Sequence, residues 1–298
     1  MSTRRVWYAL SLALVLISIG SLFVRGLNLG VDFTGGVTVQ ATFTGNADRN
    51  AVVKALQVNG YGDPQVTIFG SARDIAIRLP PTKESTEAVR TRIEQTLRQV
   101  DTGVQIQQVE VIGPQVGGEL LRSAWEALAA TLILIAMYIA LRFNTWRLSV
   151  GAILAVLHDP ILVFGVFSLS RTPFDLTVVA AMLAVIGYSL NDTVVVFDRI
   201  RERFHVARKL EPITVLDQSI NQTLSRTIMT KVVTLIVVVA LYVLGGPVLK
   251  GFSEALIIGI LAGTYSSIYI SSAIALDCGL RSEHLLPSAV KKPIDDLP

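Results

Sequence analysis

Six apolar runs, each long enough to cross a lipid bilayer, set the strongest constraint on what this chain can fold into. About 20 consecutive, predominantly apolar residues span roughly 30 Å of hydrocarbon as an α-helix. The runs lie near residues 6–24, 121–141, 148–170, 175–197, 227–246 and 252–276. The 298 residues are 51% hydrophobic and only 16% charged, with a mean hydropathy of +0.56, which is too apolar for a soluble domain. The sequence therefore predicts an α-helical integral membrane protein with six transmembrane helices.

These runs divide the chain into four parts: a first transmembrane helix over residues 1–29, a polar region over 30–115, a five-helix bundle over 116–280 and a tail over 281–298. Most of the Lys and Arg residues that flank the runs fall on one side of the membrane. The positive-inside rule then places both termini in the cytoplasm and the loop 30–115 outside. Arg4 and Arg5 precede the first run and no small-residue cleavage site follows it, which indicates an uncleaved signal anchor.

The polar region shows alternating short elements. Period-2 patterns predict strands at 37–43, 65–69, 74–79 and 104–112. Helical spacing predicts helices at 48–58, with Asn46 as a possible cap, and at 82–100, starting at Thr82 or Lys83. The order β-α-β-β-α-β is typical of a ferredoxin-like α+β domain, a scaffold that hosts many functions. The region contains no histidine and no clustered acid pair, so we expect a binding or mechanical role and no catalysis.

Asn191 and Asp192 lie within the fourth apolar run, in the segment Gly187–Glu202. A carboxylate inside a membrane-spanning helix costs about 3 kcal/mol on insertion scales and usually marks an ion or proton path. The alternative is a carboxylate in the headgroup region. Asp192 lies about 10 Å inside the boundary marked by Arg199, which favours the ion path. Asp198, beside the arginines, is better explained as a structural charge at the helix end.

Other polar residues accompany Asp192 in the apolar runs. The third run contains His158-Asp159-Pro160 near mid-membrane, either as a polar packing pair or as part of a proton path. Arg226 opens the fifth run, where it either snorkels to the interface or pairs with Asp192. Lys231 lies five residues deeper.

Three further segments have structural interpretations. Residues 204–225 are amphipathic and fit an interfacial helix on the cytoplasmic surface. In the last run, Gly259 and Gly263 form a face suited to close helix packing. Glycine-rich turns join the polar region to the membrane at 30–36 and 116–120. In the first turn Asp32 can close an Asx-type turn, and in the second Glu119 would sit in the first helical turn, where a negative charge suits the helix dipole. The glycines and the aromatic residue of these turns are Gly30, Phe33, Gly35, Gly36, Gly117 and Gly118.

The motifs together resemble the SecF family of protein-export membrane subunits, within the RND superfamily. The resemblance runs from the first apolar run to about residue 280. Its carriers are GVDFTGG at 30–36, VGGEL at 116–120, HDP at 158–160, GYSLNDTVVVFDRIRE at 187–202, TLSRT at 223–227 and GGPVLKGFS at 245–253.

The resemblance implies a bacterial inner-membrane protein that pairs with SecD and works beside the SecYEG channel and the SecA motor. It implies that the protein uses the proton-motive force to help preproteins leave the channel. The sequence itself has no paired Cys and His ligands, and its basic residues cluster beside the apolar runs, so we expect no cofactor, no metal and no nucleic acid. In the family, the residues matching Asp192 and Arg226 are associated with proton movement. Lys231 is a departure, because the family usually has a small polar residue there, and it is a possible modulator of the pair.

Two alternatives stay open on the residues alone. One is half of an RND-type exporter of small molecules or lipids, although a single small outer domain argues against a substrate cleft. The other is an intramembrane aspartyl protease using Asp159 and Asp192. The residues before Asp192 are Ser189-Leu190-Asn191, which lack the Gly-x-Gly-Asp pattern of such proteases, so we expect no enzyme.

Overall fold

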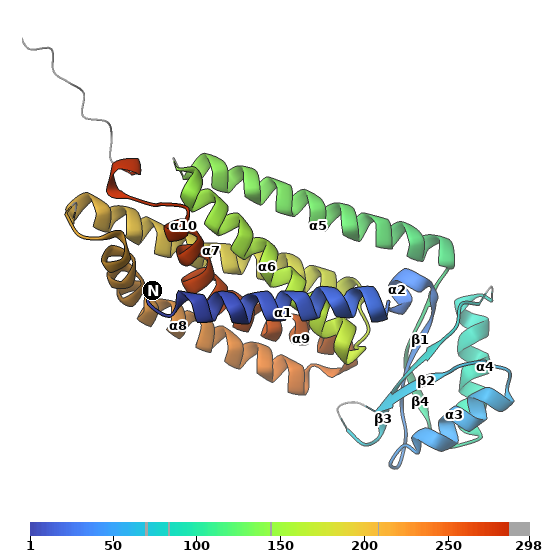
Figure 1. Ribbon diagram of the computed structural model, residues 1–298. Helices are drawn as coiled ribbons and strands as arrows, with labels where there is room; N and C mark the ends of the chain where they lie inside the picture. The colour runs from blue at the N-terminus through green and yellow to red at the C-terminus, as the bar shows by residue number, and fades with distance from the viewer. Residues whose placement is uncertain (69–70, 83, 144, 208, 286–298) are drawn as a thin grey trace, which may run out of the picture.

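The computed structural model describes residues 1–68, 71–82, 84–143, 145–207 and 209–285. Expectations about Phe69, Gly70, Lys83, Arg208 and the tail from residue 286 onward lie outside this range. The described part consists of a long helical bundle with a small sheet domain at one end and the N-terminus at the other (Figure 1).

Six helices of the described chain are long and apolar enough to cross a membrane, which confirms the predicted number of spans. The first five are α1 (Arg4–Arg25), α5 (Pro114–Arg142), α6 (Trp146–Ser170), α7 (Leu176–Val206) and α8 (Pro212–Leu244). The sixth is assembled from α9 (Gly246–Tyr265), a π-helical turn η1 (Ser266–Ile270) and α10 (Ser271–Asp277). A π-helical turn inside an α-helix often marks a functional site.

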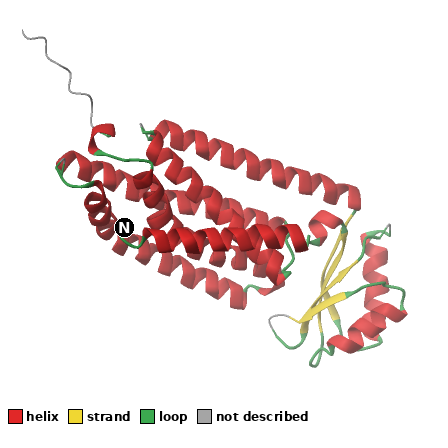
Figure 2. Cartoon of the chain, viewed as in Figure 1, coloured by secondary structure: helices red, strands yellow, loops and turns green. Residues whose placement is uncertain are grey.

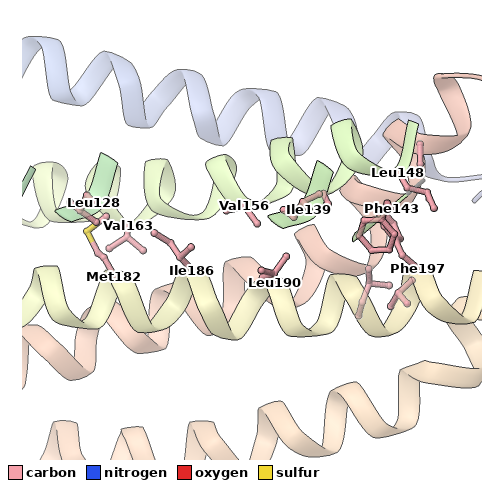
Figure 3. Packing of buried hydrophobic residues seen from close by; sticks show 14 of the residues in the cluster. Leu128, Ile139, Phe143, Leu148, Val156, Val163, Met182, Ile186, Leu190 and Phe197 are labelled. Atoms are coloured by element: carbon pink, nitrogen blue, oxygen red, sulfur yellow. The ribbon is translucent and has the colours of Figure 1, made fainter. Parts of the chain in front are cut away.

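The bundle has an inner and an outer layer. The apolar windows of α6, α7 and the sixth span are half or more buried, whereas those of α1, α5 and α8 are mostly exposed. Figure 3 shows the contact between layers, where Leu128 of α5 lies near Val163 of α6 and Met182 of α7. Phe143 and Phe197 meet edge to face, with ring centroids 5.4 Å apart. The charged residues discussed below are carried mainly by the inner helices.

The sheet domain follows the order β-α-β-β-α-β. Figure 2 shows its strands beside its helices at the end of the bundle. Its elements are β1 (Gly36–Thr42), α3 (Arg49–Val58), β2 (Gln65–Ile68), β3 (Asp74–Leu79), α4 (Thr86–Arg98) and β4 (Gln105–Ile112), preceded by the single turn α2 (Val31–Thr34). The strands pair antiparallel in the order β2-β3-β1-β4, with Val39 opposite both Ile77 and Val109. The alternate strand residues pack with the apolar faces of both helices in one core, including Val89, Ile93 and Leu97 of α4 as the spacing predicts.

Both helices of this domain start at caps that the sequence analysis did not select. Asp48 takes the place expected for Asn46, because its carboxylate accepts from the backbone N–H groups of Asn50 and Ala51. Helix α4 begins after Ser85, whose hydroxyl accepts from the N–H of Ala88, and not at Thr82. Asp and Ser are both strong N-cap residues, because their side-chain oxygens satisfy N–H groups that the helix leaves free.

The amphipathic segment 204–225 differs from the expected interfacial helix. Helix α7 ends at Val206, and α8 runs without interruption from Pro212 through the fifth span. The apolar face of its first part, formed by Val215, Leu216 and Ile220, is buried in the same core as the end of α7. This apolar face therefore packs into the core of the bundle. Pro212 suits this start because the first helical position needs no N–H partner.

Candidate functional site

The central feature of the bundle is an ion pair between α7 and α8. The Nζ atom of Lys231 lies 2.6 Å from Oδ2 of Asp192, and the two side chains are only 5% and 9% exposed. No other described group forms a hydrogen bond with either of these two atoms. Among hydrogen-bonding and charged groups, the ammonium of Lys231 and Oδ2 of Asp192 thus compensate the cost of burying each other. Removing one partner of a buried pair usually costs far more than the pair itself contributes.

Tyr188 holds the lysine in place from one turn before Asp192. The ammonium of Lys231 lies 4.1 Å from the centroid of the Tyr188 ring, a cation–π distance. The hydroxyl of Tyr188 donates to the carbonyl of Thr230 at 3.1 Å and lies 2.8 Å from the hydroxyl of Thr234. The aromatic ring is therefore anchored to α8 on both sides of the lysine.

The structure corrects the predicted pairing of Asp192 with Arg226. Contacts between the antiparallel α7 and α8 join Arg203 to Gln218, Arg199 to Gln222 and Asp192 to Lys231. In this register Arg226 falls one helical turn short of Asp192. It is exposed and lines a cavity with Val195 and Asp198. The lysine, which the sequence analysis treated as a modulator, is the direct partner.

A second polar group surrounds the His158-Asp159 pair of α6. The Oδ1 atom of Asp159 is 3.0 Å from Nδ1 of His158, and its Oδ2 atom accepts from the hydroxyl of Ser189 at 2.5 Å. Nε2 of His158 lies 2.7 Å from the hydroxyl of Tyr265. All the polar atoms of the pair are thus engaged, and Asp159 is fully buried. The result is a continuous chain of hydrogen bonds from α7 through α6 to the end of α9.

Ser189 and Tyr265 are the members of this chain that the sequence analysis missed as site residues. Ser189 lies three residues before Asp192, so α7 carries both polar groups on neighbouring turns. A signal existed, because Ser189 stands inside the GYSLND segment. Gly263 permits the contact: a Cβ there would lie 3.0 Å from the Ser189 hydroxyl and 3.1 Å from Asp159. Gly259 similarly faces Val185, so the predicted close-packing face of the sixth span is observed.

The remaining charged residues of the 187–202 segment have different roles. Asp198 pairs with Arg142 at 2.7 Å and stays 41% exposed, consistent with a structural charge at the helix end. Arg199 contacts Glu202 and Gln222. Asn191, although next to Asp192, points to the exposed side of α7 and is separate from both polar groups.

The glycine-rich turn 30–36 docks onto the start of α7. Asp32 does not close a turn of its own but caps that helix, because its carboxylate accepts from the N–H of Leu176 at 3.0 Å. The N–H of Gly30 donates to the carbonyl of Phe174 at 2.7 Å, and the rings of Phe33 and Phe174 stack. The link between α1 and the sheet domain is thereby fixed to α7, the helix that carries Asp192.

The second glycine-rich turn packs on the first. A Cβ on Gly117 would lie 2.8 Å from the carbonyl oxygen of Phe33, whereas a Cβ on Gly118 would meet nothing within 4 Å. Gly35 has φ +73°, and Gly36 has φ +148°, which favours glycine at both. Glu119 is not in a first helical turn as expected, because α5 already begins at Pro114.

Asp175 completes this junction as the N-cap of α7, where its carboxylate accepts from the N–H of Val178 at 3.1 Å. Burial raises the pKa of Asp175, and the nearby Asp32 carboxylate acts in the same direction. Its hydrogen bonds to Thr177 and Val178 oppose this effect. Two acids thus meet at a helix N-terminus, where the helix dipole favours negative charge.

No group of three or more His, Cys, Asp or Glu side chains that could hold a metal occurs within the described ranges. The site consists of one buried ion pair, one hydrogen-bonded chain and a junction to the sheet domain that is held by hydrogen bonds and ring stacking. Such an arrangement can change its charge by taking up a cation at the carboxylate of Asp192.

Comparisons of the sequence and the structure with known proteins identify its relatives. A protein-family profile described as "Protein export membrane protein SecD/SecF, C-terminal" matches residues 92–281, and the "SecD/SecF GG Motif" matches residues 20–47. The protein translocase subunit SecF of Haemophilus influenzae is 45% identical over the whole of this chain and 91% of its own length. The SecF subunit of Vibrio alginolyticus is 44% identical, with 100% of this chain and 96% of its own length covered.

A solved structure of SecDF from Thermus gives a TM-score of 0.83 at 37% identity. The alignment covers 93% of this chain but only 38% of that longer chain. A SecDF structure described as the super-membrane-facing form gives a TM-score of 0.69 with the same identity and coverage.

Proposed function

Because this chain belongs to the SecD/SecF family of protein-export membrane proteins and so acts in protein translocation, we propose that it drives that process with protons. The observation that carries the proposal is the buried Asp192–Lys231 pair in the middle of α7 and α8. An ionisable pair inside a membrane bundle is a functional site by default, since its desolvation is costly. A proton moving through 100 mV supplies about 2.3 kcal/mol, enough to bias a two-state equilibrium.

In the proposed mechanism, Asp192 takes up and releases protons, and the hydrogen-bonded chain of Asp159, His158 and Tyr265 assists their passage. Protonation removes the negative partner of Lys231 and changes the packing of α7 against α8. The start of α7 is tied to the glycine-rich turns by Asp32, so the change reaches the sheet domain. The two SecDF structures give TM-scores of 0.83 and 0.69 against this chain at the same identity and coverage. This difference supports more than one arrangement of the helices and the outer domain in the family.

The proposed setting follows the positive-inside pattern. We place the protein in the bacterial inner membrane with both termini in the cytoplasm, and the sheet domain outside, where it engages preproteins emerging from SecYEG after SecA-driven translocation. The strand order β2-β3-β1-β4 with two helices supports a ferredoxin-like fold for this domain.

The function is tested in inner-membrane vesicles that contain this chain, its SecD partner and SecYEG. We expect export of a preprotein to be faster with an imposed proton gradient and to return to the basal rate after addition of an uncoupler. The matched control is the same vesicles without this chain, in which the uncoupler should have a smaller effect. Stimulation that survives complete collapse of the gradient would contradict proton coupling.

SecD is the proposed direct partner, and the exposed face of α7 is the proposed contact. The alignment covers only 38% of the Thermus SecDF chain, which supports an association of this chain with a SecD part. On α7 the small residues Ala180, Ala184 and Gly187 and the amide of Asn191 are exposed on one face. An amide facing lipid is unfavourable, and small residues allow close helix approach.

Replacing Gly187 with leucine should reduce co-purification of SecD severely, because the added side chain would displace the proposed partner helix. Beyond its own helix, no described residue of this chain lies within 4 Å of the added Cβ. The matched control is Gly20→Leu, at another helical glycine with open space around it, on α1. Equal recovery of SecD with both variants would exclude this face as the contact.

A further inference from the structure

The carboxylate of Asp192 is already paired with a cationic side chain of the same protein, Lys231. Nζ of Lys231 lies against Oδ2, and the centroid of the Tyr188 ring lies 4.1 Å from the same ammonium. The occupied position is therefore the one that a metal cation entering the site would need.

The neighbouring polar groups of α6, α7 and α8 are already engaged or positively charged. From α7, the Tyr188 hydroxyl is engaged with Thr230 and Thr234. From α6, both oxygens of Asp159 are engaged, one with His158 and one with Ser189. From α8, the next ionisable group is Arg226, a further positive charge. Among the described residues, Asp192 is the carboxylate that pairs with Lys231, and no group of three or more His, Cys, Asp or Glu side chains that could hold a metal is found.

A proton and a sodium ion make different demands on this site. A proton needs one carboxylate oxygen, with which it forms a covalent O–H bond. Hard metal cations are bound by several oxygen ligands at once. A sodium ion would also keep its full charge beside the ammonium of Lys231, and the two like charges repel in a poorly solvated environment.

We propose that Lys231 makes this site selective for protons over sodium ions. The inference rests on the proposed ion coupling and names the ion. In the cycle, a proton adds to the carboxylate of Asp192, so that one O–H bond forms and the pair's net charge rises from zero to one positive. The ammonium stays on the Tyr188 ring until the proton leaves and the ion pair forms again.

The direct test measures occupancy of Asp192 without relying on transport. A carbodiimide reacts with protonated carboxyl groups in membranes, and mass spectrometry of the Asp192 peptide reports the extent of labelling in the purified complex. We expect sodium chloride to leave the labelling of the wild-type protein unchanged relative to potassium chloride. In Lys231→Ser, which restores a small polar residue, sodium should protect the carboxyl and cut the labelling by at least half.

Lys231→Arg is the matched conservative variant, since it keeps a cation beside the carboxylate, and its labelling should stay insensitive to sodium. Sodium protection of the wild-type protein would overturn the proposal, whether or not the serine variant folds. Absence of sodium protection in a folded Lys231→Ser protein would overturn it as well.

Export assays in vesicles separate this inference from the function itself. With an imposed sodium gradient and no proton gradient, wild-type vesicles should show no stimulation and Lys231→Ser vesicles should gain it. If sodium alone stimulates the wild-type protein, ion coupling survives and the selectivity inference fails. If neither gradient stimulates export, the proposed function fails.

Discussion

Replacing Asp192 with asparagine should abolish the stimulation of protein translocation by a proton gradient, while the chain still inserts into the membrane. Asparagine has nearly the same shape as aspartate but cannot bind and release a proton at any pH of interest. A gradient of 100 mV then has no charge to act on at this site, and the contribution of about 2.3 kcal/mol per proton is lost. The expected rate of preprotein export with the gradient equals the rate without it.

The variant also leaves the ammonium of Lys231 buried without its partner, which usually costs about 3–5 kcal/mol of stability. Loss of export could then reflect unfolding. The double variant Asp192→Asn, Lys231→Met removes both charges and should recover thermal stability in detergent, yet export should stay unresponsive to the gradient. Recovery of the gradient response in the double variant would refute the role of Asp192.

Asp198→Asn is the matched control on the same helix. Asp198 is 41% exposed and pairs with Arg142 near the end of the span. Exposed ion pairs contribute about 0–1 kcal/mol, so this variant should keep both its stability and its response to the gradient. If Asp192→Asn and Asp198→Asn lose the gradient response equally, the loss results from removing a negative charge near the helix end and not from breaking the buried pair.

The six spans and the burial of Asp192 inside one of them could be predicted because each depends on local sequence. Length and apolarity identify a membrane helix, and the cost of a buried carboxylate identifies Asp192, whatever the neighbouring helices do. Packing within the sheet domain was also predictable, since Val89, Ile93 and Leu97 follow a helical period and all are buried.

The partner of Asp192 could not be predicted in the same way. Whether Arg226 or Lys231 faces it depends on the register between α7 and α8, which is set by contacts such as that between Arg199 and Gln222 far along the pair. A shift of one helical turn, about 5.4 Å, exchanges the two cations. The roles of Asp32 and Ser189 were missed for the same reason, because their partners, Leu176 and Asp159, come from other segments.

The same helix, α7, carries the ionisable residue and contacts the chain that enters the sheet domain. Helix α7 carries Asp192 at mid-length and is held at its start by Asp32 and by the carbonyl of Phe174, which accepts from Gly30. In the proposed mechanism, this contact passes a movement of α7 after protonation to the chain that enters the sheet domain. This predicts that the junction is as important for coupling as the ion pair.

Replacing Gly117 with leucine should disrupt this junction and abolish the response of export to the gradient, although the Asp192–Lys231 pair is untouched. A Cβ at Gly117 would lie 2.8 Å from the carbonyl oxygen of Phe33 and 2.9 Å from the backbone nitrogen of Gly35. Both are backbone atoms, which cannot rotate away, so α2 must separate from α5. Overpacking of this kind typically costs about 1–3 kcal/mol.

Gly118→Leu is the matched control, at the next residue of the same helix. Nothing lies within 4 Å of a Cβ at Gly118, and replacing glycine in a helix by leucine contributes roughly 0.5–1 kcal/mol of helix propensity. Thermal unfolding of the purified complex should therefore show a lower midpoint for Gly117→Leu and an equal or higher one for Gly118→Leu. Carbodiimide labelling of Asp192 should be the same in both variants. Both glycines lie in α5 at the junction, whereas the ion pair lies at mid-length of α7. A Gly117→Leu protein that exports as well as the Gly118→Leu control would show that the sheet domain responds to protonation by a route other than this junction.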